Sequence, residues 1–423
     1  MVLFLLCLLR LLSAAAPSHA HVKFPLVYYY HLGNHECKRG LPAYLEHSLN
    51  QAVNTQSESF DIYLISTFKK CLRLNAAIDR KVAFNTAVIK VDADVIRSNK
   101  TQAFIQKYHK LFPSNIDLWK SSALRFFSIE DFMVRYNYTQ SMQIESDNML
   151  YTPLSKHILP RLLEGYPRLA ATALTKNLVT ASVFWIGHLT ALQEFTDYMN
   201  DLAWNSSISH SNTTILMDYI SYLYQNGDTK EDVGIFCNIK QQGLCIKPFA
   251  VNEMSMLAFY RSLNATQLQY LPIIPHNLPT DKKFNHLLFS RYIDTKDKLV
   301  GISMGDNAGV FDAGSYGQYL GGTSKHHGND PGTIDGSHII GEAMIKTHCY
   351  PVFMCTSDND TISSSNNNNK VVQFLPGKCR MKPYVKCREQ NVYTPLINIH
   401  VHGKHTSKFR NVECNCSSVV DRS

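Results

Sequence analysis

The start of the chain has the pattern of a strand, a helix and a second strand, and this order restricts the fold most. Residues 24–31 are apolar and aromatic, as in a buried strand. Residues 41–53 have apolar side chains at helical spacing, with Pro42 in the first turn, where proline is tolerated. Residues 61–66 predict the next strand. A strand, a helix and a strand in close succession form a βαβ unit, so we predict an α/β fold with a central, mostly parallel sheet flanked by helices.

The alternation of strands and helices continues along the chain. Further strands are predicted at residues 84–91, 138–144 and 168–172, and helices at 101–112, 117–134, 212–224 and 251–262. Residues 180–204 begin with an apolar run and are predicted to become an amphipathic helix from about His188. A polar, Asn-rich stretch near residues 357–369 is predicted to be a loop. No internal repeat is visible, and we predict a single domain over residues 21–423.

The N-terminus has the pattern of a secretory signal. Residues 1–20 are apolar and end in small side chains, which predicts cleavage after Ala20. Arg10 interrupts the apolar run, which falls short of the roughly 20 residues that a membrane span needs. A retained signal anchor is the alternative, and no other segment is expected to cross a membrane. The Asn-X-Ser/Thr acceptor sites also favour the ER or Golgi lumen or secretion: Asn99, Asn137, Asn205, Asn212, Asn264, Asn359 and Asn415.

Cysteines and charge narrow the class of protein further. The chain has 11 cysteines, and loss of Cys7 with the signal leaves an even number that crowds toward the C-terminus. We therefore predict a disulfide-stapled C-terminal region of unassigned pairing, and no Cys-X-X-Cys pair supports a zinc site instead. The net charge is +8 without a dense basic run, and no basic-aromatic stripe occurs, so we expect no nucleic-acid partner.

Two acids mark the end of one predicted strand. Glu145 and Asp147 follow residues 138–144, one residue apart. Ligands of parallel sheets bind beyond the carboxyl ends of the strands. Two carboxylates there can hold one hard cation, which can in turn hold a diphosphate. The alternative is a solvated strand end or a helix cap.

A histidine-rich stretch near the C-terminus offers further ligands. His400 and His402 share one face of a predicted strand, and Lys404 follows. One imidazole could complete the shell of a divalent ion, and the lysine could neutralise phosphate. The alternative is a polar strand end.

Two other segments carry polar groups that suit a sugar or a proton transfer. Residues 311–323 form a predicted glycine-rich loop, in which Asp312 and Gln318 offer hydrogen bonds to sugar hydroxyls. Glu253 lies near a predicted helix start and is either a general base or a residue that favours the helix dipole. Residues 33–36, Gly-Asn-His-Glu, match one metal-ligand motif of the binuclear metallophosphoesterases. The Asp-X-His and Gly-Asp motifs that precede it in that family are absent from this sequence.

Together these motifs resemble the nucleotide-sugar-dependent glycosyltransferases of the GT-A fold. The resemblance extends over residues 24–409 and rests on the order of the motifs. It implies a transferase of the hexosyl or N-acetylhexosaminyl class that moves a sugar from a nucleotide-sugar, with UDP favoured over GDP, to a glycan acceptor. The alternatives are a secreted metal-dependent hydrolase and a non-catalytic carbohydrate-binding protein.

The resemblance also implies roles for individual residues. Mn²⁺ or Mg²⁺ would be held by Asp147, with Glu145 in a first motif position where the family has Asp, and by the late His402. Asp312 and then Glu253 would serve as the general base of an inverting enzyme. The remaining donor-binding residues would be Tyr30, His31, Ser66, Gln318 and Lys404.

Overall fold

The computed structural model describes residues 23–30, 40–111, 117–175, 178–205, 218, 253–275, 309–322, 330–357, 379–387, 392–401, 409–410 and 413–414. The predicted signal at residues 1–20 lies outside them. So do all but one residue of the predicted helix 212–224 and of the Asn-rich stretch at 357–369. Within the described ranges, no helix is both long and apolar enough to span a bilayer.

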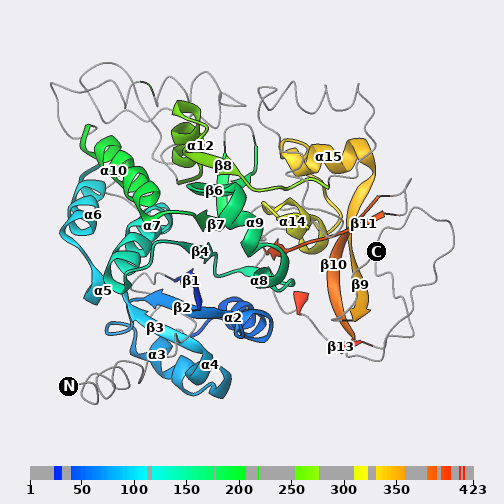
Figure 1. Ribbon diagram of the computed structural model, residues 1–423, viewed down its shortest axis with the longest axis horizontal. Coiled ribbons are helices and arrows are strands. Elements are labelled where there is room, and N and C mark those ends of the chain that lie inside the picture. The colour runs from blue at the N-terminus through cyan, green and yellow to red at the C-terminus, as the bar shows by residue number, and fades with distance from the viewer. Residues whose placement is uncertain are drawn as a thin grey trace, which may run out of the picture.

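The core of the structure is a seven-stranded sheet in the order β3-β2-β1-β4-β7-β6-β8 (Figure 1). Strands β1 to β4 pair in parallel, β7 pairs antiparallel with both β4 and β6, and β8 runs parallel to β6. Only β7 therefore opposes the others, and the predicted mostly parallel sheet is confirmed. The strand bounds are Phe24–Tyr29 (β1), Phe60–Ser66 (β2), Val88–Asp92 (β3), Ser141–Ile144 (β4), Leu169–Ala173 (β6), Val179–Ile186 (β7) and Leu268–Tyr270 (β8).

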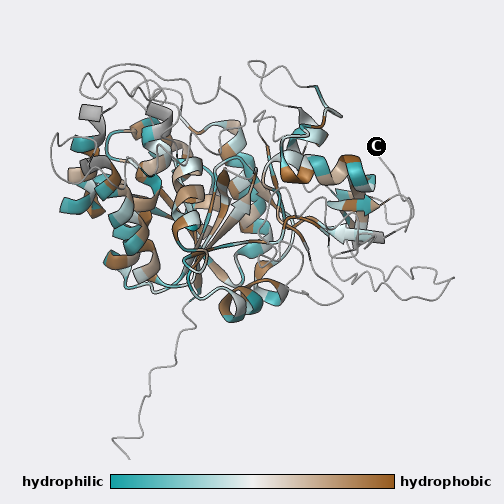
Figure 2. Cartoon of the chain, turned by 90° about the horizontal axis from the view of Figure 1, so that it is seen from above, coloured by the Kyte–Doolittle hydropathy of each residue, from teal (hydrophilic) through white to brown (hydrophobic). Residues whose placement is uncertain are grey.

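Helices cover both faces of this sheet because the buried strands alternate their side chains between two apolar clusters. In β1, Val27 belongs to one cluster and Leu26 to the other. The first cluster is closed by α5 (Ala93–Ile96), α6 (Asn99–Leu111), α7 (Asp117–Tyr136), α10 (Leu189–Asn205) and α12 (Glu253–Leu263). The second is closed by α2 (Ala43–Gln56), α3 (Leu72–Asp79), α4 (Val82–Ala87), α8 (Leu154–His157) and α9 (Leu159–Gly165). Figure 2 shows the hydrophobic strands at the centre of these layers.

The C-terminal part packs beside the sheet around a third apolar cluster. This cluster contains residues from α14 (Ser315–Gly321), α15 (Ile339–Thr347) and the antiparallel ribbon that β5 (Asn148–Leu150) forms with β12 (Asn398–His400). A further sheet contains β9 (Cys349–Ser357), β10 (Cys379–Cys387), β11 (Val392–Pro395) and β13 (Glu413–Cys414). Disulfides join Cys349 to Cys387 and Cys355 to Cys414, so the predicted stapled region is confirmed, with pairs that are not nearest in sequence.

Two local predictions were wrong. Residues 84–91 were predicted as a strand, but the chain forms α4 before β3 begins at Val88. The fully buried Phe84 packs in the second cluster, and such packing outweighs the strand preference of its side chain. Residues 311–323 were predicted as a glycine-rich loop, but most of them form α14. Backbone N–H groups at the start of this helix donate to the carboxylate of Asp312.

Candidate functional site

The two acids lie in the turn that leads from the central sheet into the β5–β12 ribbon. Glu145 directly follows β4, and its backbone N–H donates to Ser182 O at 3.0 Å. The N–H of Asn148 then donates to Glu145 O at 3.1 Å, which closes the turn just after Asp147. Since β4 runs parallel to β1, the acids lie at the carboxyl edge of the parallel strands, as the sequence predicted.

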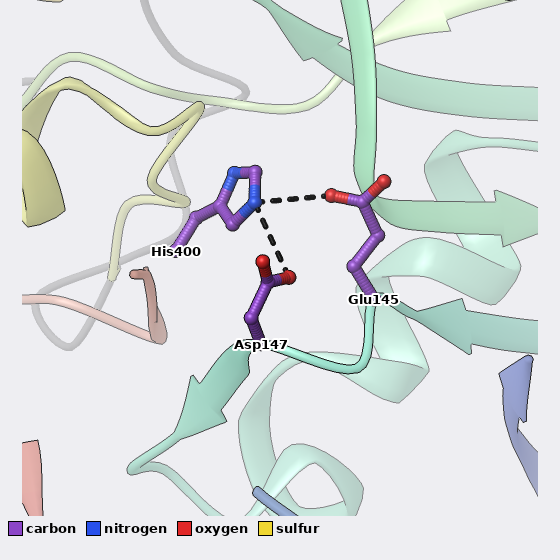
Figure 3. Close-up of side chains that lie close together, drawn as sticks. All are labelled: Glu145, Asp147 and His400. Atoms are coloured by element: carbon purple, nitrogen blue, oxygen red, sulfur yellow. Dashed lines mark ion pairs between the residues drawn. The ribbon is translucent and has the colours of Figure 1, made fainter. Parts of the chain in front are cut away.

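His400 comes to these acids from a distant part of the chain. Strand β12 pairs with β5 so that His400 lies opposite Asn148, and the N–H of Val401 donates to Asp147 O at 3.1 Å. His400 Nε2 lies 3.2 Å from Glu145 Oε2 and 3.4 Å from Asp147 Oδ1 (Figure 3). The three ligand atoms are all within 4.8 Å of one another.

This spacing suits a divalent cation. An octahedral ion with ligands at about 2.1 Å separates neighbouring ligand atoms by roughly 3 Å, close to the distances at His400. Carboxylate oxygens are preferred by Mg²⁺ and Mn²⁺, and an imidazole nitrogen suits transition metals. The three side chains remain 11 to 20 % exposed, so the site is reachable from solvent.

The same residues form a charged cluster in the metal-free protein. Burial lowers the pKa of the His400 imidazole, but Asp147 and Glu145 outweigh it and raise the pKa to about 9. His400 is therefore an imidazolium ion paired with two carboxylates near neutral pH. A metal ion would have to replace this proton on Nε2.

A buried arginine supports Glu145 from the opposite side. Arg125 of α7 is 6 % exposed, and its Nη1 lies 2.5 Å from Glu145 Oε1. Its Nη2 lies 3.8 Å from Oε1 of Glu253, the first residue of α12. Burial raises the pKa of Glu253 to about 7, with Arg125 opposing and Glu145 adding to the rise. Arg125 was not predicted as a site residue, although a cation between the apolar residues Leu124 and Phe126 of a predicted helix was a usable signal.

Asp312 is fully buried beside the histidine strand rather than within the cluster of ligand atoms. Oδ1 accepts the N–H groups of Gly314 and Tyr316, and Oδ2 accepts those of Gly317 and His400. Burial raises the pKa of its carboxyl group, although these N–H groups act in the other direction. Its role as a general base stays a prediction.

The remaining predicted residues lie at the edge of the sheet, in α14 or outside the residues that the structure describes. Tyr30 and Ser66 follow or end β1 and β2 at the carboxyl edge, and both are buried. Gln318 is buried in α14. His31, His402, Lys404 and the motif at residues 33–36 lie outside the described residues, so their predicted roles stay predictions.

A polar cavity of about 300 Å³ lies elsewhere, along α2. None of its lining residues belongs to the Glu145–Asp147–His400 cluster, so cavity size does not identify the chemical site. Its walls are Glu46, His47, Asn50, Gln51, Asn54, Thr55, Arg380 and Arg410.

Comparison with known proteins returns distant structural likenesses. No protein-family model matches the sequence, and no curated protein matches it significantly. The apo structure of mouse xyloside xylosyltransferase 1 aligns at 9 % identity and a TM-score of 0.38, over 64 % of this chain and 94 % of that one. The galactosyltransferase LgtC, in complex with donor and acceptor sugar analogs, aligns at 12 % identity and a TM-score of 0.32, over 65 % and 83 %.

The PaToxG glycosyltransferase aligns at 8 % identity and a TM-score of 0.30, over 48 % of this chain and 75 % of that one. These proteins are glycosyltransferases, the class that the sequence resembles. Because the TM-scores are low, we infer function from the geometry of the site itself.

Proposed function

We propose that this protein is a metal-dependent glycosyltransferase that moves a sugar from a nucleotide-sugar to a hydroxyl group of a glycan or glycoconjugate. The observation that carries the proposal is the convergence of Glu145, Asp147 and His400 at the carboxyl edge of β1, β2 and β4. In parallel sheets this edge is where nucleotides and other ligands bind. Two acids and an imidazole form a ligand set for Mn²⁺ or Mg²⁺.

Different residues of the chain would then bind the nucleotide, the sugar and the diphosphate of the donor. Tyr30 and Ser66, at the ends of β1 and β2, and the predicted His31 would hold the nucleotide. Gln318 and Lys404 would contact the sugar and the diphosphate. The bound cation would supply positive charge that stabilises the departing nucleotide diphosphate. Arg125 would hold Glu145 in position through its buried ion pair.

A proton acceptor is needed only if transfer inverts the anomeric centre. Of the two predicted bases, Glu253 has a pKa of about 7, near the pH at which a base works well. Its Oε2 has no hydrogen-bond partner within the described part of the chain, whereas both oxygens of Asp312 are occupied. We therefore assign the base of an inverting reaction to Glu253.

The finer assignments rest on the family resemblance of the sequence and on its predicted secretory signal. We propose a UDP-sugar donor, a hexosyl or N-acetylhexosaminyl group, and work in the lumen of the ER or Golgi or outside the cell. The disulfides Cys349–Cys387 and Cys355–Cys414 support an oxidising compartment.

A donor screen on the wild type and on Asp147→Ala tests the proposal. We expect UDP or a UDP-sugar with Mn²⁺ to raise the melting temperature, because a ligand at 100 times its Kd adds about 2.7 kcal/mol of stability. In Asp147→Ala, the Mn²⁺-dependent part of this rise should disappear, and transfer should fall at least about 100-fold.

The matched control is Asp79→Ala, which removes a surface acid that is 45 % exposed and paired with Lys90. It should keep wild-type transfer. Full transfer activity in folded Asp147→Ala would refute the proposal, as would a wild type that no nucleotide stabilises with either metal.

A further inference from the structure

We propose that Asp312 is a positioning residue for the metal site: with Gly317 it forms a cradle that holds the backbone of His400 where the imidazole meets Glu145 and Asp147. The inference rests on the proposed function, because it assigns His400 to the metal. It gives Asp312 a role different from the general base that the sequence suggested.

The carboxylate of Asp312 joins two elements that are far apart in sequence. Oδ1 accepts N–H groups of Gly314 at 2.7 Å and Tyr316 at 3.0 Å, and Oδ2 accepts that of Gly317 at 2.9 Å. These groups belong to the N-cap residue Gly314 and to the first turn of α14, where backbone N–H groups have no partners within the helix. Oδ2 also accepts the N–H of His400 at 3.0 Å. One buried side chain therefore ties the start of α14 to the residue that carries the imidazole.

Gly317 brings the same helix into direct contact with His400. A Cβ atom at Gly317 would lie 2.0 Å from the carbonyl oxygen of His400 and 2.9 Å from its carbonyl carbon. No side chain fits at that distance, so the backbone of α14 packs directly on the backbone of β12. The cradle thus holds His400 by its N–H on one side and by its carbonyl group on the other.

Asn398 extends this contact to β5, the strand that directly follows the two acids. Its Oδ1 accepts the N–H of Asp312 at 3.1 Å, and its Nδ2 donates to Asp312 O at 3.2 Å. The same Nδ2 donates to Oδ1 of Asn148 at 3.0 Å, and Asn148 directly follows Asp147. All of these side chains are fully buried. A displacement of Asp312 would therefore move both β12, which carries His400, and the start of β5, which directly follows Asp147.

The geometry of Asp312 fits positioning better than proton transfer. A general base needs an oxygen within hydrogen-bond reach of the acceptor hydroxyl. Each oxygen of Asp312 already accepts two backbone N–H groups, and the side chain is 0 % exposed. Groups that orient a metal ligand typically change metal affinity about 10- to 100-fold when they are mutated.

Asp312→Asn is the first test. The amide group keeps one acceptor oxygen but turns an NH₂ toward backbone N–H groups, which loosens the cradle with little change of volume. We expect the Kd for Mn²⁺, measured by titration calorimetry or electron paramagnetic resonance on the full chain, to rise at least about tenfold. Transfer should recover as Mn²⁺ is raised. Loss of a general base would instead lower kcat at saturating Mn²⁺ and leave the Kd unchanged.

Gly317→Ala is an independent second variant, since the added Cβ displaces the carbonyl group of His400 rather than its N–H group. It should weaken Mn²⁺ binding as well, with the fold checked by circular dichroism. Gly336→Ala is its control, because a Cβ there meets only Ile345 at an ordinary 3.5 Å. Asp330→Asn, at an exposed position, is the control for Asp312→Asn.

The outcomes separate this inference from the proposed function. Weaker Mn²⁺ binding by either folded variant, with both controls unchanged, supports the cradle. Wild-type Mn²⁺ affinity in the folded variants overturns the cradle and leaves the proposed function standing. A wild type that binds neither Mn²⁺ nor Mg²⁺ overturns the proposed function, and this inference with it.

Discussion

Two buried polar clusters flank Glu145, Asp147 and His400, and they differ in how completely their atoms are hydrogen-bonded. The Asp312 flank consists of Asn148, Asp312 and Asn398, and each side-chain oxygen and nitrogen of these residues has a partner. The Arg125 flank consists of Arg125 and Glu253, which form an ion pair, together with Gln143. Gln143 pairs with Val27 and so lies on the face of the sheet that α7 and α12 cover. Among the described residues, Arg125 Nε, both amide atoms of Gln143 and Glu253 Oε2 have no hydrogen-bond partner.

Exposure does not explain the difference, since all six residues are buried. A buried polar atom without a partner costs about 1 to 3 kcal/mol, and proteins retain such atoms mainly where function uses them. We therefore expect the Asp312 flank to hold ligand atoms in place. The Arg125 flank should instead respond to changes of charge, and its atoms should be available to bound substrate or water.

The largest expected effect comes from removing the cation of the Arg125 flank. Arg125→Ala leaves the carboxylate of Glu145, and the buried Glu253 wherever it is ionised, without their guanidinium partner. Breaking a buried ion pair in this way typically costs about 3 to 5 kcal/mol. Urea unfolding at neutral pH, without added metal, measures the loss.

Arg168→Ala is the matched control, because Arg168 pairs with Glu194 at the surface, where the side chains are 29 and 50 % exposed. An exposed pair contributes at most about 1 kcal/mol. If both variants lose the same stability, charge does not organise the Arg125 flank, and the contrast with the Asp312 flank fails.

A smaller effect is expected from pH, through Glu253. Its pKa is raised to about 7 in the folded protein from 4.5, so the protonated carboxyl group favours the fold. This contribution is full below pH 4.5 and is lost as pH rises toward about 7. Glu253→Gln keeps the group uncharged, so it should gain stability relative to the wild type over this range, on the order of 1 to 3 kcal/mol.

Unfolding by urea at pH 4.5 and pH 8, in a chelator, measures this difference. Glu164→Gln changes an exposed acid and should follow the pH dependence of the wild type. An equal stability difference between Glu253→Gln and the wild type at both pH values would show that Glu253 ionises as an ordinary carboxyl group.

The sequence predicted what depends on local patterns. The βαβ start follows from apolar strands around an amphipathic helix, and the acids Glu145 and Asp147 could be placed because they directly follow a strand. The histidine strand was also identified, although the resemblance selected His402, whereas the structure brings His400 to the acids.

What could not be predicted depends on contacts between distant segments. Helix α14 contains two glycines, which disfavour a helix, and it forms because the buried carboxylate of Asp312 accepts N–H groups of its first turn. The residues of the Arg125 flank come from α7, β4 and the start of α12. No spacing along the chain predicts that these three elements lie close together. Gln143 looked like one polar residue in a strand, with nothing to show that both amide atoms would be buried.

The smallest expected effect tests Gln143 itself. Its amide atoms are fully buried without hydrogen-bond partners in the described part of the chain. Gln143→Met keeps the length of the side chain and removes the unpaired polar atoms, so we expect a gain of stability of up to about 1 kcal/mol. A simultaneous fall in kcat/KM would show that the amide binds the donor or a water held with it.

Gln51→Met is the matched control on α2, since Gln51 is also buried but its Nε2 donates to Leu150 O at 2.7 Å. That variant leaves a buried carbonyl group without its donor and should lose about 1 to 2 kcal/mol. The free energy of unfolding should therefore rise in Gln143→Met and fall in Gln51→Met, and this difference of sign distinguishes an unpaired amide from a paired one. If Gln143→Met is as destabilising as Gln51→Met in urea unfolding, the amide of Gln143 is hydrogen-bonded in solution, and the two flanks do not differ at this residue.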